Sequence, residues 1–312
     1  PEVMLRSPLE GRVEGRLVRV PVVTHPLERQ PRIAMTAPDL PQRLLAHLHE
    51  LARPRHAQWD PWGLMGVRAY VRDHLRTFGA VEEHRFQEES EAGTNLILRL
   101  PGRDAQLSPL LVGAHYDGPL HSIGADDNAS GVAALLELAR RWSRQPPRRP
   151  VWIAAFDLEE WGMLGSRALA RDLRAADQPL HLMVSLEMLA FTSSTQAYPV
   201  PGMRWIYGER GDFIALISNA AAAWMLPGLA RAVGRHGPTK VLPVPLAGRP
   251  IPAVRLSDHS PFWDQGYNAL MVTDTSFLRN PHYHRMSDTV DTLDLPFFCG
   301  VVEGVAEALE TI

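Results

Sequence analysis

Three runs of apolar residues in the middle of the chain constrain its fold more than any other feature. They are Pro109–Asp117 (PLLVGAHYD), Arg149–Asp157 (RPVWIAAFD) and His181–Leu189 (HLMVSLEML), separated by segments with helical periodicity such as Ala129–Trp142. Strands that are apolar along most of their length are typical of a parallel sheet with helices on both faces. The sequence therefore predicts an α/β fold of three layers, with a mostly parallel mixed sheet in the middle.

The other periodic segments fit one domain of this kind over residues 37–312. Leucines at helical spacing predict a helix from Leu40 to Leu51, and a similar pattern predicts a second helix from Trp62 to Phe78. Residues 190–257 carry the weakest pattern. The remaining predictions are strands at Thr94–Gly102 and Asn268–Thr275, a helix at Gly162–Leu173, and short helical patches within Phe213–Met225.

Residues 1–36 differ from the rest of the chain in composition. They are rich in proline and arginine, and only Arg16–Val23 alternates in the way that a β-strand does. We predict that they form an extended N-terminal arm outside the domain.

Charge and composition exclude several classes of protein. The formal net charge is −3, which gives no basis for a nucleic-acid partner or an anionic membrane partner. No apolar stretch approaches the ~20 residues of a membrane-spanning helix, so no membrane partner is expected. The single cysteine, Cys299, allows no intrachain disulfide, which favours a cytoplasmic protein unless a signal peptide was removed. The oligomeric state stays open.

Acidic residues and a histidine gather where the predicted strands end. They are His115 and Asp117, Glu159 and Glu160, and Glu187, while the loop GADDNASG places Asp126 and Asp127 just before a helix. Open α/β sheets carry their functional sites at the carboxyl ends of the strands. A cluster of carboxylates repels itself unless a cation compensates it. The pattern therefore indicates a metal site at this edge of the sheet.

Each part of this pattern also has an ordinary structural explanation. A histidine at a strand end is commonly a hydrogen-bonded surface residue, and the paired aspartates suit a turn or a helix cap. The Glu159–Glu160 pair suits the solvated start of a helix. None of these explanations accounts for the convergence of four separate segments at one edge.

Five segments within residues 95–310 carry a family resemblance. In chain order they are GAHYDG, GADDNASGVAALLELAR, FDLEEWGMLGSRALA, SLEML and NPHYHRMSDTVDTLD. Their order and spacing resemble those of the co-catalytic di-zinc exopeptidases, which include bacterial leucine-type aminopeptidases and, more distantly, glutamate carboxypeptidases and glutaminyl cyclases. One segment alone is a weak signal, but five in the right order are a specific one.

The resemblance implies two Zn²⁺ ions per chain and a role for each matched residue. The ligands would be His115, Asp127 (bridging both ions), Glu160, Glu187 and His284, with Glu159 as the unliganded general base and Asp117 orienting His115. Three ligand carboxylates and a hydroxide would balance the charge of the two ions. The same ligand types also suit cobalt or manganese.

Two features depart from the well-known secreted members of that family. Glu187 stands where those members have Asp, which implies a ligand with a longer reach. The chain can form none of the disulfides that those members tend to carry, because it has one cysteine. A substrate therefore cannot be taken over from any one relative.

Several residues near the motifs are weaker candidates. Asp258 either caps a helix with Pro261 in its first turn or joins the site, and His259 is undecided in the same way. His282 lies two residues before His284, which fits the motif better. Four aromatic residues either line a side-chain pocket or belong to the core: Trp205, Tyr207, Phe213 and Trp224.

These observations predict a zinc-dependent exopeptidase, with an aminopeptidase as the leading hypothesis. It would hydrolyse the first bond of a peptide with a free N-terminus through a metal-bridged hydroxide, with Glu159 as the general base. Apart from Arg140 at the end of the second segment, the motifs contain no arginine or lysine except Arg167 and Arg285, whereas a carboxypeptidase needs a cation for the C-terminal carboxylate.

Three alternatives remain. A carboxypeptidase and a glutaminyl cyclase-like enzyme would share the fold, and the cyclase is disfavoured by His115 and Glu187 because those enzymes keep one zinc. The third is a catalytically inactive member that only binds, which is disfavoured because every ligand position is filled.

Overall fold

The computed structural model describes residues 11–13, 16–18, 39–88 and 90–312. Contacts divide the chain into two units, Pro1–Ala37 and Pro38–Ile312. In the first unit, β1 (Gly11–Val13) and β2 (Arg16–Val18) form an antiparallel pair. The predicted strand at Arg16–Val23 is thus described over its first three residues only. The rest of the predicted arm at 1–36 lies outside the described residues and stays a prediction.

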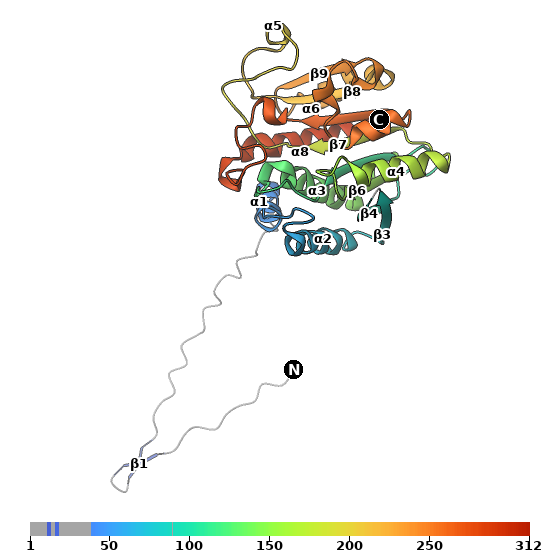
Figure 1. Cartoon of the computed structure of the whole chain (residues 1–312). Helices are drawn as coiled ribbons and strands as arrows, with labels where there is room; N and C mark the ends of the chain where they lie inside the picture. The colour runs from blue at the N-terminus through green and yellow to red at the C-terminus, as the bar shows by residue number, and fades with distance from the viewer. Residues whose placement is uncertain (1–10, 14–15, 19–38, 89) are drawn as a thin grey trace. The chain divides into compact units, whose positions relative to one another are not determined.

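The second unit is built on one eight-stranded sheet (Figure 1), with the strand order β3-β4-β6-β5-β7-β10-β8-β9. Strands β6, β5, β7 and β10 run parallel to one another, whereas β3 and β4 add an antiparallel edge. At the opposite edge β8 is antiparallel to β10 and parallel to β9. The strands are β3 (Val81–Glu88), β4 (Glu91–Leu100), β5 (Leu110–His115), β6 (Val151–Phe156), β7 (Leu182–Glu187), β8 (Ile214–Asn219), β9 (Thr239–Val244) and β10 (Ala269–Thr273).

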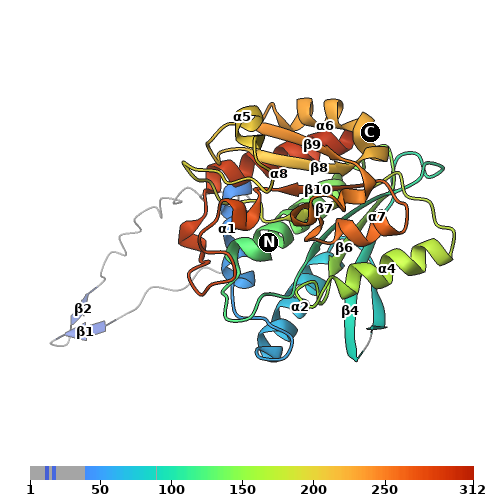
Figure 2. The same ribbon diagram turned by 45° about the horizontal axis from the view of Figure 1, so that its top comes forward.

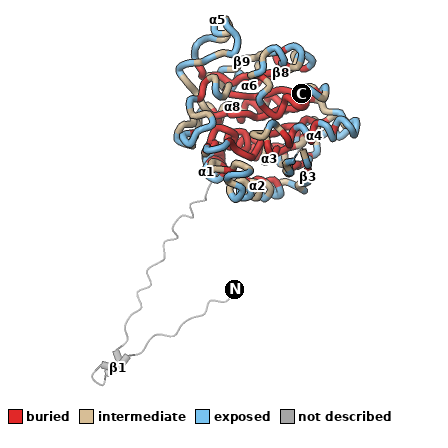
Figure 3. The backbone as a smooth tube through the Cα atoms, viewed as in Figure 1, coloured by how far each residue is buried: buried red, intermediate tan, exposed pale blue. Residues whose placement is uncertain are grey.

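Helices cover both faces of the sheet (Figure 2). One face packs against α1 (Leu40–Leu51), α2 (Pro61–Arg76), α3 (Gly131–Arg144), α6 (Leu226–Val233) and α8 (Leu295–Glu310), and the other against α4 (Leu164–Ala175) and α7 (His259–Asp264). Buried residues concentrate in the sheet and in the helices nearest to it (Figure 3). The prediction of a three-layer α/β fold with a mixed sheet is confirmed.

The apolar faces that predicted the first helices lie in the core. Leu44, Leu48 and Leu51 of α1 are buried, and Trp142 near the end of α3 is fully buried. Asp39 begins α1 by accepting a hydrogen bond from the backbone of Gln42, which satisfies one of the free N–H groups of the first turn. Among the described residues no helix combines the length and the apolar character that crossing a membrane requires.

The helical patches predicted within Phe213–Met225 are wrong in their first half. Ile214–Asn219 is the strand β8, and only Ala220–Met225 is helical, as a 3₁₀-helix. The sequence FIALISN is apolar at nearly every position, so its periodicity does not distinguish a buried strand from a buried helix. The strands β3 and β9 were not predicted, because one is largely polar and the other contains Pro243.

Candidate metal centre and the adjoining pocket

The five predicted metal ligands come from separate segments and meet at the carboxyl edge of the parallel strands. His115 ends β5 and Glu187 ends β7, while Asp127 lies in the short helical turn Ala125–Ser130 before α3. Glu160 follows β6 and His284 follows β10. The convergence has a simple cause: parallel neighbours deliver their ends to the same edge.

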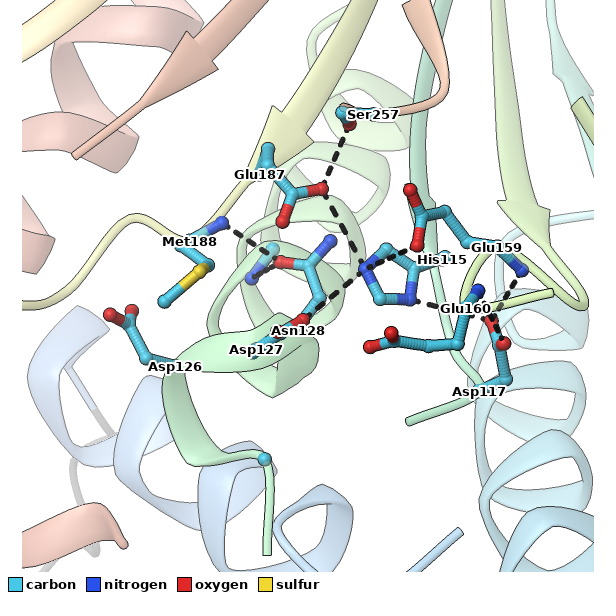
Figure 4. Close-up of polar contacts among 12 residues, drawn as sticks. His115, Asp117, Asp126, Asp127, Asn128, Glu159, Glu160, Glu187, Met188 and Ser257 are labelled. Atoms are coloured by element: carbon cyan, nitrogen blue, oxygen red, sulfur yellow. Dashed lines mark hydrogen bonds and ion pairs between the residues drawn. The ribbon is translucent and has the colours of Figure 1, made fainter. Parts of the chain in front are cut away.

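The side chains form two groups that share Asp127. In the first (Figure 4), His115 Nε2 lies 3.5 Å from Asp127 Oδ1 and 3.6 Å from Glu187 Oε2. In the second, His284 Nε2 lies 3.2 Å from Asp127 Oδ2 and 3.5 Å from Glu160 Oε2. Within each group of three, the ligand atoms lie within 4.8 Å of one another. One carboxylate thus faces two candidate metal positions.

Asp126 is not part of this cluster, although it is adjacent to Asp127. It lies apart from the ligands in Figure 4, and its carboxylate accepts hydrogen bonds from the backbone of Ala190 and from the side chain of Asn280. The first aspartate of the pair therefore fixes the loop, and the second faces the centre.

The electrostatics of the cluster favour a compensating cation. Burial, and then repulsion from Asp127 and Glu159, raises the pKa of Glu160 well above its usual value. Burial also raises the pKa of Glu187. His115 behaves in the opposite way, because burial alone would lower its pKa but the carboxylates around it, Glu159 foremost, raise it. Carboxylates packed this closely cannot all ionise without a cation among them.

Unpaired polar atoms support the same reading. Glu160 Oε1 is buried and has no hydrogen-bond partner among the described residues. A buried oxygen of this kind is costly unless it binds something. Histidine nitrogens and carboxylate oxygens are the donors that zinc takes in proteins. The residues present therefore fit a divalent metal.

Glu159 lies beside the ligands and faces the same space. Its Oε2 is 4.0 Å from His115 Nε2, and its side chain is 14% exposed, so solvent or substrate can reach it. Burial raises the pKa of its carboxyl well above the usual value, although His115 opposes this. His115, Glu159 and Glu160 also satisfy the geometric condition for a metal site, so distance alone does not separate a base from a ligand.

Asp117 holds the loop that carries the two glutamates. Its carboxylate accepts hydrogen bonds from the backbone N–H of Glu159, at 3.0 Å, and of Glu160, at 3.1 Å. The same carboxylate lies 3.4 Å from His115 Nδ1, on the side of the ring away from the ligand cluster. Asp117 is fully buried; its hydrogen bonds fix the backbone of both glutamates, and its carboxylate lies beside the imidazole of His115.

Arg55 positions the centre from outside the motifs, and sequence reasoning missed it. Its side chain is fully buried in the loop after α1 and donates to the backbone carbonyls of Asp117, Gly124 and Asp127, at 3.2, 2.9 and 3.0 Å. It also donates to Leu51, Arg53 and Ile123. One guanidinium thus ties together two of the loops that bear ligands. Nothing in the local pattern LARPRHAQ distinguishes this arginine from a surface one.

Asp288 was also missed, although it lies in a quoted motif. Its carboxylate accepts hydrogen bonds from the backbone N–H of Asp126 and of Asp127, at 3.0 and 3.1 Å. Burial raises its pKa to about 7. Asp288 therefore fixes the turn that presents the shared ligand.

The structure distinguishes the weaker candidates for the site by where their side chains lie. Asp258 precedes α7 but its side chain makes no capping hydrogen bond; it is fully buried near Glu159, and burial raises its pKa to about 7. His259 is buried against Trp263 and contacts the carbonyl of Val254 at 2.8 Å, away from the ligands. His282 contacts Ser287 Oγ at 3.0 Å and belongs to no candidate metal group among the described residues.

An open pocket of about 280 Å³ extends from the ligand cluster along the sheet. Its acidic end contains the carboxylates of Asp127, Glu159, Glu160 and Glu187 together with His284. Beyond it the lining is mainly apolar and includes Ile217 and Met271 of the sheet, Phe213 just before β8, and Met203 and Tyr207 of the short helix α5 (Met203–Tyr207). Of the predicted aromatic candidates, Tyr207 and Phe213 line this pocket, whereas Trp205 and Trp224 are 82% and 69% exposed.

Lys240 of β9 also lines the pocket, and sequence reasoning assigned it no role. It is the only lysine in the chain and the only lysine or arginine among the lining residues. The pairing of β9 with β8 places Lys240 beside Ala215, and no local sequence pattern indicates this position.

Comparison with known proteins gives one family match. A sequence profile of Peptidase family M28 matches residues 95–309. The uncharacterized protein YfbL of Escherichia coli (strain K12) is 37% identical over 213 residues, which cover 64% of this chain and 66% of YfbL. Leupeptin-inactivating enzyme 1 of Streptomyces exfoliatus is 32% identical over 154 residues, which cover 46% of this chain and 35% of that protein. The chain spans less than two thirds of the length of each relative.

Solved structures share the fold. The LapA aminopeptidase of Legionella pneumophila has a TM-score of 0.67 at 19% identity, covering 87% of this chain and 71% of LapA. A glutaminyl cyclase of Tannerella forsythia has a TM-score of 0.65 at 17% identity, covering 87% and 98%. A zinc aminopeptidase of Bacillus subtilis has a TM-score of 0.53 at 22% identity, covering 70% and 50%. Since these neighbours include both peptidases and a cyclase, fold likeness does not determine the reaction.

Proposed function

This chain belongs to peptidase family M28, and on that premise we propose that it is a zinc-dependent aminopeptidase that removes the N-terminal residue of peptides. The donor set of two histidines and three carboxylates supports zinc. Two ligand groups that share Asp127 support two ions per chain. Bound zinc would polarise the scissile carbonyl and lower the pKa of water.

Glu159 is the residue that moves the proton in this proposal. It faces the pocket beside the ligand groups, and the backbone of its loop is fixed by Asp117. From this position the carboxylate accepts a proton from the attacking water and then donates it to the leaving amine. Asp117 and Arg55 act on this step indirectly, because they hold the loops that carry Glu159, His115 and Asp127.

The single observation that carries the aminopeptidase proposal is the charge of the pocket near the ligands. Four carboxylates and His284 line that end, and no lysine or arginine of the lining lies there. An α-ammonium group of a substrate would find acceptors beside the scissile bond, which positions the first carbonyl for attack. A C-terminal carboxylate beside the same bond would meet Glu159 and the other carboxylates and no lysine or arginine side chain of the lining.

The test compares four peptides on zinc-loaded protein. The first is an amide with a free N-terminus, the second is its N-acetyl form, the third is an N-acetyl peptide with a free carboxylate, and the fourth begins with glutamine. We expect cleavage of the first only, plus removal of the glutamine from the fourth without cyclisation. Cleavage of the third alone would make the protein a carboxypeptidase, cyclisation of the fourth a cyclase, and binding without turnover an inactive member.

A further inference from the structure

The pocket has two ends of opposite charge, and the strand register connects them. Glu187 of β7 pairs with Thr273 of β10, Thr273 with Ala215 of β8, and Ala215 with Lys240 of β9. Directly paired residues point to the same face of a sheet, so these four side chains form one row across four strands. Glu187 and Lys240 occupy its two ends. Thr273 and Ala215 between them are small, which keeps the floor of the pocket low.

Lys240 has no partner that would explain its position. Among the residues that the structure describes, its ammonium group makes no hydrogen bond and no ion pair. The pocket residues nearest to it in the sheet, Ala215, Ile217 and Leu242, are apolar. Lys240 is half-buried as a residue, so its aliphatic stem can pack against these apolar side chains while its ammonium group stays available to a ligand. The pocket therefore offers an unused cation to whatever occupies it.

The distance between the two ends selects among possible anions. Neighbouring strands lie about 4.8 Å apart, so three steps place the Cα atoms of Glu187 and Lys240 about 14 Å apart. The flexible side chain of Lys240 can lean along the row toward Glu187, and an extended peptide of about three residues, about 10 Å long, then joins the two ends. The side chain of a single N-terminal glutamate or aspartate is too short to join the two ends.

We propose that Lys240 binds the C-terminal carboxylate of a short peptide whose N-terminal residue lies at the metal centre. This inference rests on the aminopeptidase proposal and makes it narrower: the substrates are peptides of about three residues with both ends free. The acidic end receives the ammonium group, the apolar middle receives the side chains, and Lys240 receives the carboxylate. Charge at both ends then selects length as well as direction.

An edge strand offers a competing explanation for the lysine. β9 is the last strand of the sheet, and lysines on edge strands hinder pairing with a second molecule. On that explanation, loss of the charge would promote association of the protein and leave substrate choice unchanged. The two explanations therefore predict different measurements on the same variant.

The first experiment measures kcat/KM on zinc-loaded protein for Leu-Gly-Gly, its C-terminal amide, and the amide Leu-Gly-Glu-NH₂. We expect the free carboxylate to be preferred over the amide by about 10- to 100-fold, the effect of a hydrogen bond to a charged group. Lys240→Met should abolish this preference, and Lys240→Arg should keep most of it. Good cleavage of Leu-Gly-Glu-NH₂ that also depends on Lys240 would identify a side-chain carboxylate as the anion and overturn the C-terminal assignment.

The matched control is Arg249→Met. Arg249 is 74% exposed at its side chain and does not line the pocket, but its loss changes the net charge by the same one unit. We expect its preference for the free carboxylate to equal that of the wild type. The proposal is overturned if the wild type does not distinguish acid from amide, or if Lys240→Met lowers both rates equally. Increased self-association of Lys240→Met with an unchanged preference would overturn it in favour of the edge-strand explanation.

A second experiment needs no turnover and separates this inference from the proposed function. Lys240 carries the only lysine ε-amine in this sequence, so its acetylation can be followed without interference from other lysines. Acetylation of Lys240 is followed by mass spectrometry on protein stripped of metal, with millimolar Leu-Gly-Gly or its amide present. We expect protection by the acid and not by the amide. Equal protection by both refutes the contact, whereas protection without N-terminal hydrolysis by the loaded enzyme refutes only the aminopeptidase proposal.

Discussion

The two ends of the pocket are built in different ways. The acidic end consists of strand ends and loops whose backbone is fixed by buried polar side chains: Asp117, Arg55 and Asp288 hold it. The lysine end consists of strand faces, with Lys240 and apolar neighbours from β8 and β9. A side-chain hydrogen bond that supports it runs from the Tyr207 hydroxyl to the backbone carbonyl of Val241 in β9, at 3.0 Å. A fixed end suits a reaction with strict geometry, and an end made of side chains on a sheet suits the selection of substrates. Changes at the first should alter turnover, and changes at the second should alter substrate choice.

Removal of the metal should give the largest loss of activity. It should also distinguish the two ends of the pocket, because only the acidic end binds the metal. We expect about two zinc ions per chain and complete loss of hydrolysis after chelation, with recovery when zinc is returned. Lys240→Met should bind the same amount of zinc as the wild type. Metal analysis of carefully loaded protein together with a peptide assay tests this, and one equivalent or none would refute the two-ion centre.

Glu159→Gln should give the second-largest loss of activity. We expect turnover to fall by about 10²–10⁴-fold because a proton carrier is lost, while zinc content stays near that of the wild type. Glu160→Gln is the matched variant one residue away, and it should lose zinc as well as activity. If both variants lost zinc to the same extent, the division between base and ligand would be wrong.

Arg55→Lys should weaken the acidic end without touching a ligand. Lysine keeps the charge but cannot reach the same set of carbonyls, so we expect zinc affinity to fall by about 10- to 100-fold, as for other groups that orient ligands. Arg55→Met should also lower the free energy of unfolding, since each buried carbonyl left unpaired costs about 1–3 kcal/mol. Titration with a zinc chelator measures the affinity. Unchanged zinc affinity in a folded Arg55→Lys variant would show that the Asp117 and Asp127 loops keep their positions without the contacts of the guanidinium group.

Ala215→Phe should give the smallest effect and should act on the other end only. Ala215 is the small residue between Thr273 and Lys240, and a ring there would fill the floor of the pocket. We expect kcat/KM for Leu-Gly-Gly to fall by about 10-fold, with zinc content unchanged and the dipeptide amide Leu-Gly-NH₂ less affected. Equal losses for both peptides would indicate that the substrate does not cross Ala215.

The sequence predicted the acidic end because its residues stand in short contiguous motifs after apolar strands. His115, Glu159 and Glu187 could be placed at one edge from strand order alone, since parallel strands share the edge where they end. The parallel middle of the sheet was predictable for the same reason. Strands that are buried on both faces have a recognisable composition.

The lysine end could not be predicted by this route. Lys240 lies in TKVLPV, whose proline and mixed polarity conceal a strand, and β8 was read as helical because its apolar run fits either structure. Their neighbours in space come from distant parts of the chain, so pairing and register, not local pattern, place Lys240 beside Ala215. The role of Arg55 could not be predicted for a related reason. Its hydrogen-bond partners are backbone carbonyls of loops distant in the sequence, and no sequence motif describes such contacts.

The position of Arg55 also bears on where the functional unit begins. The match to the family profile starts at residue 95, but the guanidinium that joins the Asp117 and Asp127 loops lies forty residues earlier, after α1. A fragment cut at the profile boundary would retain all five candidate ligands and lose the side chain that sets their spacing. The segment between α1 and α2 therefore stabilises the loops of the candidate metal centre through Arg55. We expect a minimal active fragment to begin before residue 55.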